Sequence, residues 1–185
     1  MKHSIVTRRT LSVLVENAPG VLSQVSRLFS RKGYNIESLA VGTTDDPAVS
    51  RITIEVNGDD QQIEQIINQL RKQYVVYSVR ALNAENSIRR ELVLIKVSAD
   101  SRETRNEVVQ LANIFRASII DVSTTTLTLA IIGEESKNDA LEQLLSEFGI
   151  LELVRTGIVA LERGQSTISD EHKETTEFNL GKSTI

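Results

Sequence analysis

Apolar residues recur along this chain at two different spacings. Alternation at every second residue, as in Leu11, Val13 and Val15, is typical of a strand with one buried face. Spacings of three and four residues, as between Val21 and Phe29, are typical of an amphipathic helix. The alternating stretches predict strands at 10–15, 35–42, 51–56, 75–82, 91–97, 119–122, 127–132 and 150–161. The other stretches predict helices between Pro19 and Gly33, Asp60 and Tyr74, Glu103 and Phe115, and Ser136 and Phe148.

These elements follow the order strand, helix, strand, strand, helix, strand, and the order occurs twice. It is the order of a ferredoxin-like domain. We therefore predict an α+β protein of two tandem ferredoxin-like βαββαβ domains, with the last strand interrupted at Gly157. The expected boundaries are a flexible N-terminus at 1–8, a first domain at 9–82, a linker at 83–90, a second domain at 91–163 and a polar tail at 164–185. The tail is expected to be disordered because its few apolar residues cannot offset the entropy of ordering it.

Composition narrows the class of protein. The 185 residues are 40% hydrophobic but only 4% aromatic, so the expected cores are aliphatic. A net charge of −4 gives no basic footprint for nucleic acid. Without cysteine there can be no disulfide, which suits a protein of the cytoplasm. No apolar run approaches the roughly 18 residues of a membrane span, and the polar, basic start is unlike a secretory signal.

Catalytic residue patterns are scarce. His3 and His172 lie in the two expected disordered ends, with no carboxylate or nucleophile at a useful spacing. Asp45 and Asp46 precede Pro47, a combination that is typical of a turn. Neither phosphate-binding glycine motif, G-x-x-x-x-G-K or G-x-G-x-x-G, occurs. We therefore expect no catalytic residue and no metal site on this chain.

The turn between the first strand and the first helix is the best candidate for ligand binding. It reads Glu16-Asn17-Ala18-Pro19-Gly20. The first turn of a helix has unpaired N–H groups and a partial positive charge, so it can accept a carboxylate. Asn17, and Asn35 after the helix, could supply amide oxygens for an ammonium group. The same residues also fit a plain helix-capping turn, and physical reasoning alone does not decide between the two interpretations.

Longer strings of sequence resemble a known family. LSVLVENAPGVL at 11–22 and LFSRKGYNIESL at 28–39 are similar to an ACT domain, and closely to that of the small regulatory subunit of acetolactate synthase (acetohydroxyacid synthase). The similarity continues through TDDP at 44–47, SRITI at 50–54 and EQIINQL at 64–70. In the second half, RELVLIK at 90–96 and GIVAL at 157–161 resemble the C-terminal domain of that family. The resemblance covers about residues 9–164.

The resemblance implies a regulatory role. Domains of this family pair through their first helices and sheets as homodimers, and a branched-chain amino acid, typically valine, binds at the interface. The ligand-contacting positions fall on Asn17, Gly20 and Asn35, and the positions that line the pocket are Ala18, Pro19, Val21, Leu22 and Ile36. A separate large catalytic subunit holds thiamine diphosphate, Mg²⁺ and FAD. The small subunit raises its activity and confers feedback inhibition.

Three alternatives to this role are compatible with a chain of this kind. The chain could itself form acetolactate, but it is short and lacks a Gly-Asp-Gly plus Asn arrangement for a Mg-diphosphate. It could bind RNA, since RNA-recognition motifs share the βαββαβ order, but Ile52, Ile54, Val93 and Ile95 stand where stacking aromatic residues are needed. A freestanding amino-acid sensor for another enzyme is the remaining alternative, because Pro-Gly ACT modules regulate many partners.

Overall fold

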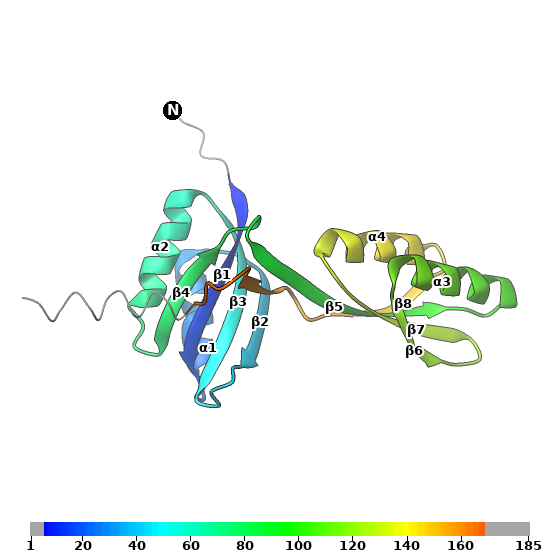
Figure 1. Ribbon diagram of the computed structural model, residues 1–185, viewed down its shortest axis with the longest axis horizontal. Coiled ribbons are helices and arrows are strands. Elements are labelled where there is room, and N and C mark those ends of the chain that lie inside the picture. Colours follow the sequence, from blue (N-terminus) through cyan, green and yellow to red (C-terminus); the bar gives the residue numbers. More distant parts are fainter. Residues whose placement is uncertain (1–5, 169–185) are drawn as a thin grey trace, which may run out of the picture. The chain divides into compact units, whose positions relative to one another are not determined.

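The computed structural model describes residues 6–168, which form two compact units (Figure 1). Of these residues, 6–88 and 160–168 form the first unit, and 89–159 form the second. In the first unit the chain forms β1 (Thr7–Glu16), α1 (Val21–Lys32), β2 (Ile36–Thr43), β3 (Val49–Gly58), α2 (Asp60–Arg71) and β4 (Val76–Leu82). Its sheet has the order β2-β3-β1-β4, and each neighbouring pair is antiparallel.

The second unit repeats this topology. Its elements are β5 (Ser87–Ser98), α3 (Arg102–Phe115), β6 (Ser118–Val122), β7 (Thr126–Gly133), α4 (Glu135–Ser146) and β8 (Ile150–Arg155). The first residues of β5 and most of a further strand, β9 (Val159–Glu162), already belong to the first unit. The sheet order is β6-β7-β5-β8, the counterpart of the first sheet, and β9 also pairs with β5. The predicted pair of ferredoxin-like folds is therefore confirmed. The break before β9 falls at Gly157, whose φ of 77° interrupts the extended backbone.

Each unit has an aliphatic core between the sheet and its two helices. In the first unit, Leu11 and Val13 are fully buried and alternate with residues of the outer face, as the sequence pattern predicts. Helix α1 buries Val21, Val25 and Phe29 against them, which is the stripe expected from spacings of three and four residues. This packing fixes the end of β1 against the start of α1, where the candidate turn lies.

The first strand begins earlier than predicted. Residues 1–8 were expected to be a flexible N-terminus, but Thr7 and Arg8 already belong to β1, where they pair with Gly58 and Asn57 of β3. Arg8 also forms an ion pair with Glu55, a carboxylate whose side chain is completely buried. The strand is held by charge and by backbone pairing, neither of which produces an apolar alternation. Residues 1–5 lie outside the described part of the chain.

The expected linker is shorter in the structure. Residues 83–90 were predicted to join the domains, but Ser87–Arg90 form the start of β5. The start of this strand contains two adjacent arginines, at 89 and 90, and therefore shows no apolar alternation.

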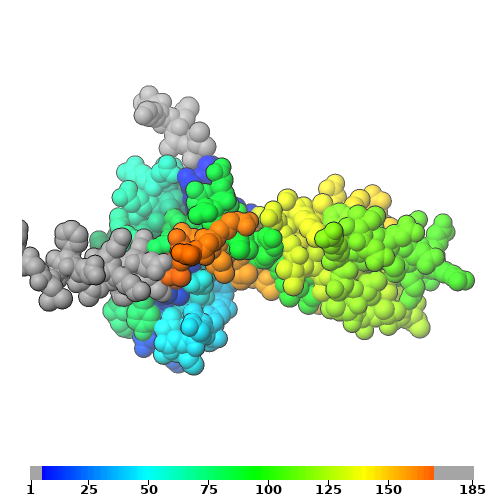
Figure 2. Space-filling view, in the orientation of Figure 1, coloured from blue at the N-terminus to red at the C-terminus, as the bar shows by residue number. Residues whose placement is uncertain are grey.

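The C-terminal boundary also differs from the prediction. Residues 160–168, which we call the return segment, belong to the first unit rather than to the second domain or to a disordered tail. Ser78 donates a hydrogen bond of 3.0 Å to the carbonyl of Ile168, and Ile168 is only 6% exposed. Arg80 forms an ion pair with Glu162. The return segment is visible as orange atoms at the surface in Figure 2. The rest of the expected tail lies outside the described residues.

None of the helices in residues 6–168 is long and apolar enough to cross a membrane. Within the same residues, no group of three or more His, Cys, Asp or Glu side chains could hold a metal ion.

Candidate functional site

The turn between β1 and α1 is fixed by backbone hydrogen bonds to two other segments. The Glu16 N–H donates to Val75 O at 2.8 Å, just before β4. The Asn17 N–H donates to Ala48 O at 2.7 Å, in the loop between β2 and β3. The turn is therefore clamped between two loops of the same unit, although its residues Asn17, Pro19 and Gly20 are exposed to solvent.

The N-terminus of α1 carries no side-chain cap. Gly20 is the N-cap residue, with a left-handed φ of 87°, and no side chain accepts a hydrogen bond from the first turn. That first turn contains no acidic residue. A Cβ built at Gly20 would meet no atom within 4 Å, so open space lies in front of the helix end. The Val21 N–H donates to Ala18 O at 3.3 Å. The remaining N–H groups of the first turn, the positive end of the helix dipole and free space are the properties of an anion site.

Both candidate asparagines already donate hydrogen bonds within the unit. The Asn17 side-chain amide donates to Pro47 O at 2.8 Å. The Asn35 amide donates to Glu37 Oε1 at 2.6 Å, and Asn57 donates to the same oxygen at 3.0 Å. These contacts use the NH₂ groups and leave the amide oxygens as acceptors. Asn17 is therefore a loop anchor that can also accept a hydrogen bond from a ligand.

The two asparagines lie at opposite ends of the sheet. Both β1 and β2 pair antiparallel to β3, so they run in the same direction. Asn17 follows the end of β1, beside Val49, whereas Asn35 precedes β2, whose Ile36 pairs with Val56 at the other end of β3. Helix α1, with 12 residues and a length of about 18 Å, separates them. One copy of the chain does not bring these asparagines together.

The expected lining residues differ in exposure. Leu22 is 42% exposed on α1, Pro19 is exposed, and Ala18 and Ile36 are half-buried against the core. Val21 is only 4% exposed and belongs to the core of the unit, so it is the one least accessible to a ligand. Sequence reasoning missed Pro47 and Ala48, the hydrogen-bond partners of Asn17. They lie 30 residues along the chain, in a loop with no periodic signal.

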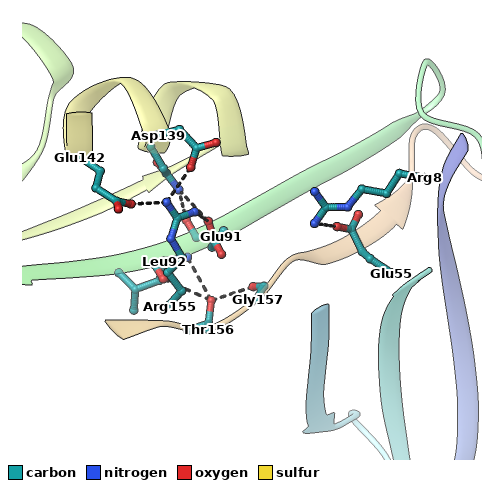
Figure 3. Close-up of polar contacts among 10 residues, drawn as sticks. Arg8, Glu55, Glu91, Leu92, Asp139, Glu142, Arg155, Thr156 and Gly157 are labelled. Atoms are coloured by element: carbon teal, nitrogen blue, oxygen red, sulfur yellow. Dashed lines mark hydrogen bonds and ion pairs between the residues drawn. The ribbon is translucent and has the colours of Figure 1, made fainter. Parts of the chain in front are cut away.

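The second unit holds a dense ion-pair cluster instead of an open helix end. Arg155 of β8 contacts Glu91 of β5 and two acidic residues of α4, Asp139 and Glu142 (Figure 3). Partial burial alone would lower the pKa of Arg155, but hydrogen bonds to Glu142 and Asp139 and the charge of Glu91 raise it further above its ordinary value. The arginine therefore remains charged throughout the alkaline range in which proteins stay folded. Its role is to join α4 to the sheet.

Comparison with known proteins matches both halves of the chain. Residues 11–78 match the ACT domain of proteins like the small subunit of acetohydroxyacid synthase, and residues 90–164 match the small subunit of acetolactate synthase. The chain belongs to the family of acetolactate synthase small subunits. A probable small subunit of Archaeoglobus fulgidus is 50% identical over 89% of this chain and 98% of its own length. The small subunit of Mycobacterium leprae is 49% identical over 84% of this chain and 91% of its own length.

A solved structure of the family has the same fold. The small subunit of acetolactate synthase from Thermotoga maritima superposes with a TM-score of 0.82 at 42% identity, covering 86% of this chain and 99% of that one. As a small subunit, the chain has a regulatory role beside a large catalytic subunit, and the cofactors of the enzyme belong to that large subunit. The suspected family resemblance is thereby confirmed.

Proposed function

We propose that this chain is the non-catalytic regulatory subunit that raises the activity of the acetolactate synthase large subunit and makes it sensitive to a branched-chain amino acid, typically valine. The observation that carries the proposal is the pair of half-sites at the two ends of α1. An open helix N-terminus lies at one end of α1, and Asn35 lies beyond the other. A symmetric dimer in which two α1 helices lie antiparallel completes both sites.

Features of the first unit favour such a dimer. Strand β2 is at the end of the sheet order, so its outer edge can continue into a second sheet. On α1, Ser23, Ser26 and Ser30 follow the spacing of one helix face, and such small side chains allow a second helix to approach closely. In this arrangement the turn of one copy faces Asn35 and Ile36 of the other.

The proposed ligand contacts follow from the chemistry of the half-sites. The N–H groups of the first turn of α1 bind the carboxylate of the amino acid. The side-chain oxygens of Asn17 and the partner copy's asparagine at position 35 accept hydrogen bonds from its ammonium group. Leu22 and Ile36, with Ala18 and Pro19, contact the branched alkyl group. A ligand held by two copies stabilises one geometry of their interface, and the large subunit responds to that geometry.

The large subunit supplies the chemistry. In the family, thiamine diphosphate, Mg²⁺ and FAD reside there, and this chain contributes no group to the carbon–carbon bond formed from pyruvate and a second 2-oxo acid. The contribution of this chain is the difference between the free energies with which the amino acid binds the two interface geometries. Coupling between sites in proteins is typically worth about 1–3 kcal/mol, which corresponds to about 5- to 150-fold in affinity.

A mixed-dimer experiment tests whether the site is shared. Gly20→Asp places a carboxylate in the open space at the helix end, and Asn35→Ala removes the distal amide. A dimer with one copy of each variant has one site with both defects and one intact site, so calorimetry is expected to recover one valine site per dimer. Each variant alone is expected to bind weakly or not at all. If mixing restores nothing although the copies exchange, the shared site is wrong.

Reconstitution with the large subunit tests the regulatory role. Adding this chain should raise acetolactate production several-fold, and valine should then lower it, with Gly20→Asp leaving the activation and removing the inhibition. Unchanged turnover on adding the chain would support the runner-up, a freestanding sensor that regulates another enzyme. The two experiments thus test the proposed ligand and the proposed partner separately, because calorimetry on the small subunit alone reports only ligand binding.

A further inference from the structure

A cavity of about 550 Å³ lies on the outer face of the first sheet, opposite the helices. Its floor is a row of register partners. Leu14 of β1 pairs with Arg51 of β3 on one side and with Ser78 of β4 on the other. The next residue in the row, Gly42 of β2, pairs with Arg51 and has no side chain to cover it. The glycine leaves one flank of the arginine open.

The β2–β3 loop closes one end of this cavity, and the return segment lies near the other. Asp45 and Asp46 of the loop line the cavity, as does Val49 just after it. Ser78 lines it too and donates the hydrogen bond that holds Ile168 of the return segment. The return segment also covers a smaller hollow of about 260 Å³, which Arg51 borders from the other side. Arg51 thus stands between the two hollows.

Arg51 differs from Arg80 and Arg8, two other arginines of the first unit, in having no ion-pair partner among the described residues. Arg80 is paired with Glu162, and Arg8 is paired with the buried Glu55. Arg51 is half-buried, yet within residues 6–168 its guanidinium has no hydrogen-bond or ion-pair partner. A guanidinium in a partly desolvated hollow is a strong donor to a planar carboxylate.

The cavity also contains groups that suit the rest of an amino acid. The Asp45 carboxylate makes no hydrogen bond or ion pair within the described residues, whereas Asp46 already accepts a hydrogen bond of 2.9 Å from the Ala48 N–H. Leu14 and Val49 supply apolar surface, and Tyr77 supplies an aromatic ring. A half-buried cation, Arg51, together with the carboxylates of Asp45 and Asp46, complements a zwitterion better than a simple anion. The volume falls in the range of about 300–1,000 Å³ that is typical of ligand pockets.

We propose that this cavity is a second amino-acid site, distinct from the turn, for a zwitterion with a side chain larger than that of valine. Arg51 binds the carboxylate, Asp45 binds the ammonium group, and Leu14, Val49 and Tyr77 contact the side chain. The site needs only one copy of the chain, because every lining group belongs to the first unit. The dimer-borne valine site and this one therefore stand or fall separately.

The β2–β3 loop gives this site a physical connection to the turn. Pro47 and Ala48 of that loop accept both hydrogen bonds of Asn17, one from its side chain and one from its backbone. A ligand that contacts Asp45 therefore contacts a loop whose position Asn17 determines. Because coupling is reciprocal, each ligand should change the affinity of the other by the same factor.

The test uses L-phenylalanine as the probe, because its side chain fills more of the cavity than a branched aliphatic one. Titration of the full chain, followed by calorimetry and by amide NMR shifts, is expected to saturate and to move the signals of residues around Arg51. The matched compounds 3-phenylpropionate, without the ammonium group, and 2-phenylethylamine, without the carboxylate, should each bind at least about tenfold more weakly.

Variants locate the probe. Arg51→Met keeps most of the side-chain length and should weaken L-phenylalanine binding about tenfold or more, while Arg102→Met, at an exposed arginine of the second unit, should leave it unchanged. Gly20→Asp should also leave it unchanged. The proposal is overturned by the absence of saturable binding, by wild-type affinity in folded Arg51→Met, or by loss of binding in Gly20→Asp with retention in Arg51→Met.

Discussion

The first helices of the two units have the same place in the same fold, but their N-termini are finished in different ways. Helix α3 is capped by Ser101, whose hydroxyl accepts a hydrogen bond of 3.0 Å from the Thr104 N–H. Its Arg105 then donates to the carbonyls of Ala99, Ser123 and Thr124, which joins the preceding turn to the β6–β7 loop. Helix α1 has no side-chain cap, and its neighbouring loop is held through Asn17.

This contrast shows what a regulatory site requires of the fold. A helix end capped by its own serine already has an acceptor for one of its first-turn N–H groups, so fewer of them remain for a ligand. An end capped only by Gly20 forgoes the side-chain cap, at a cost of only about a few tenths of a kcal/mol relative to a capping serine, and leaves its N–H groups for an external carboxylate. The two units therefore separate two tasks, with ligand binding proposed for the first and a capped, ion-paired structure in the second.

The largest expected effect comes from closing the open helix end. Gly20→Asp places a carboxylate where the ligand's carboxylate is proposed to bind and forces a non-glycine residue to adopt a left-handed φ. We expect valine binding to become undetectable by calorimetry. The matched control is Gly149→Asp, because Gly149 has nearly the same φ of 89° but lies in the second unit. Undiminished valine binding in Gly20→Asp would mean that the turn is not the site.

The next-largest expected effect concerns the ion-pair cluster of the second unit. Arg155→Met leaves Glu91, whose side chain is only 6% exposed, without its cation. Breaking a buried pair on one side costs about 3–5 kcal/mol, and the partial exposure of Arg155 places the expected loss of unfolding free energy at about 2–4 kcal/mol. Urea denaturation measures it. Lys96→Met breaks the exposed pair with Glu152 and should cost no more than about 1 kcal/mol. Equal costs for the two variants would contradict the structural role of the cluster.

The pH dependence follows from the raised pKa of Arg155. A cation whose pKa is higher in the folded state stabilises the fold fully below its unfolded pKa and loses that contribution only as the pH rises through the folded value. For an arginine this window lies above the pH range of ordinary assays. The contribution of Arg155 to the unfolding free energy should therefore stay constant from neutral to moderately alkaline pH. Over this range, the wild type and Arg155→Met should show the same pH dependence of stability.

The smallest expected effect comes from removing the cap of the second unit. Ser101→Ala deletes the acceptor for Thr104 N–H and should lower the unfolding free energy by about 1 kcal/mol. Valine affinity should stay unchanged, since α3 is not proposed to bind it. A thermal-unfolding comparison with Ser136→Ala, an exposed serine of α4 that is not its N-cap, provides the control. Loss of valine binding in Ser101→Ala would place an effector in the second unit.

Apolar patterning was sufficient for the fold but not for its polar contacts. The alternation of Leu11, Val13 and Val15 and the stripe of α1 predicted β1, α1 and their buried faces. The first residues of β1 were missed because Arg8 is held by an ion pair, which leaves no periodic trace. The same reason hid the start of β5, where a strand reads Arg89-Arg90.

The candidate site was predicted from a different kind of information. Gly20 and Asn17 could be proposed from local turn chemistry, and family resemblance added Asn35. Their distances, partners and placement at opposite ends of α1 depend on strand register, which short-range patterns do not specify. Arg51 gave no signal at all, because one arginine on the outer face of a strand is usually solvated. Its significance comes from Gly42 beside it and from the return segment.

The return segment makes the second unit an insertion within the first. A fragment cut after Leu82, where the first βαββαβ order ends, would lack Glu162 and Ile168 and so expose the side chains of Arg80 and Ser78 that contact them. Excising the inserted unit and rejoining residue 88 to residue 160 through a short Gly-Ser bridge would keep both contacts. The first unit is thus formed by two separate segments of the sequence that fold into one compact body. Truncated variants made to study its regulation have to contain both segments.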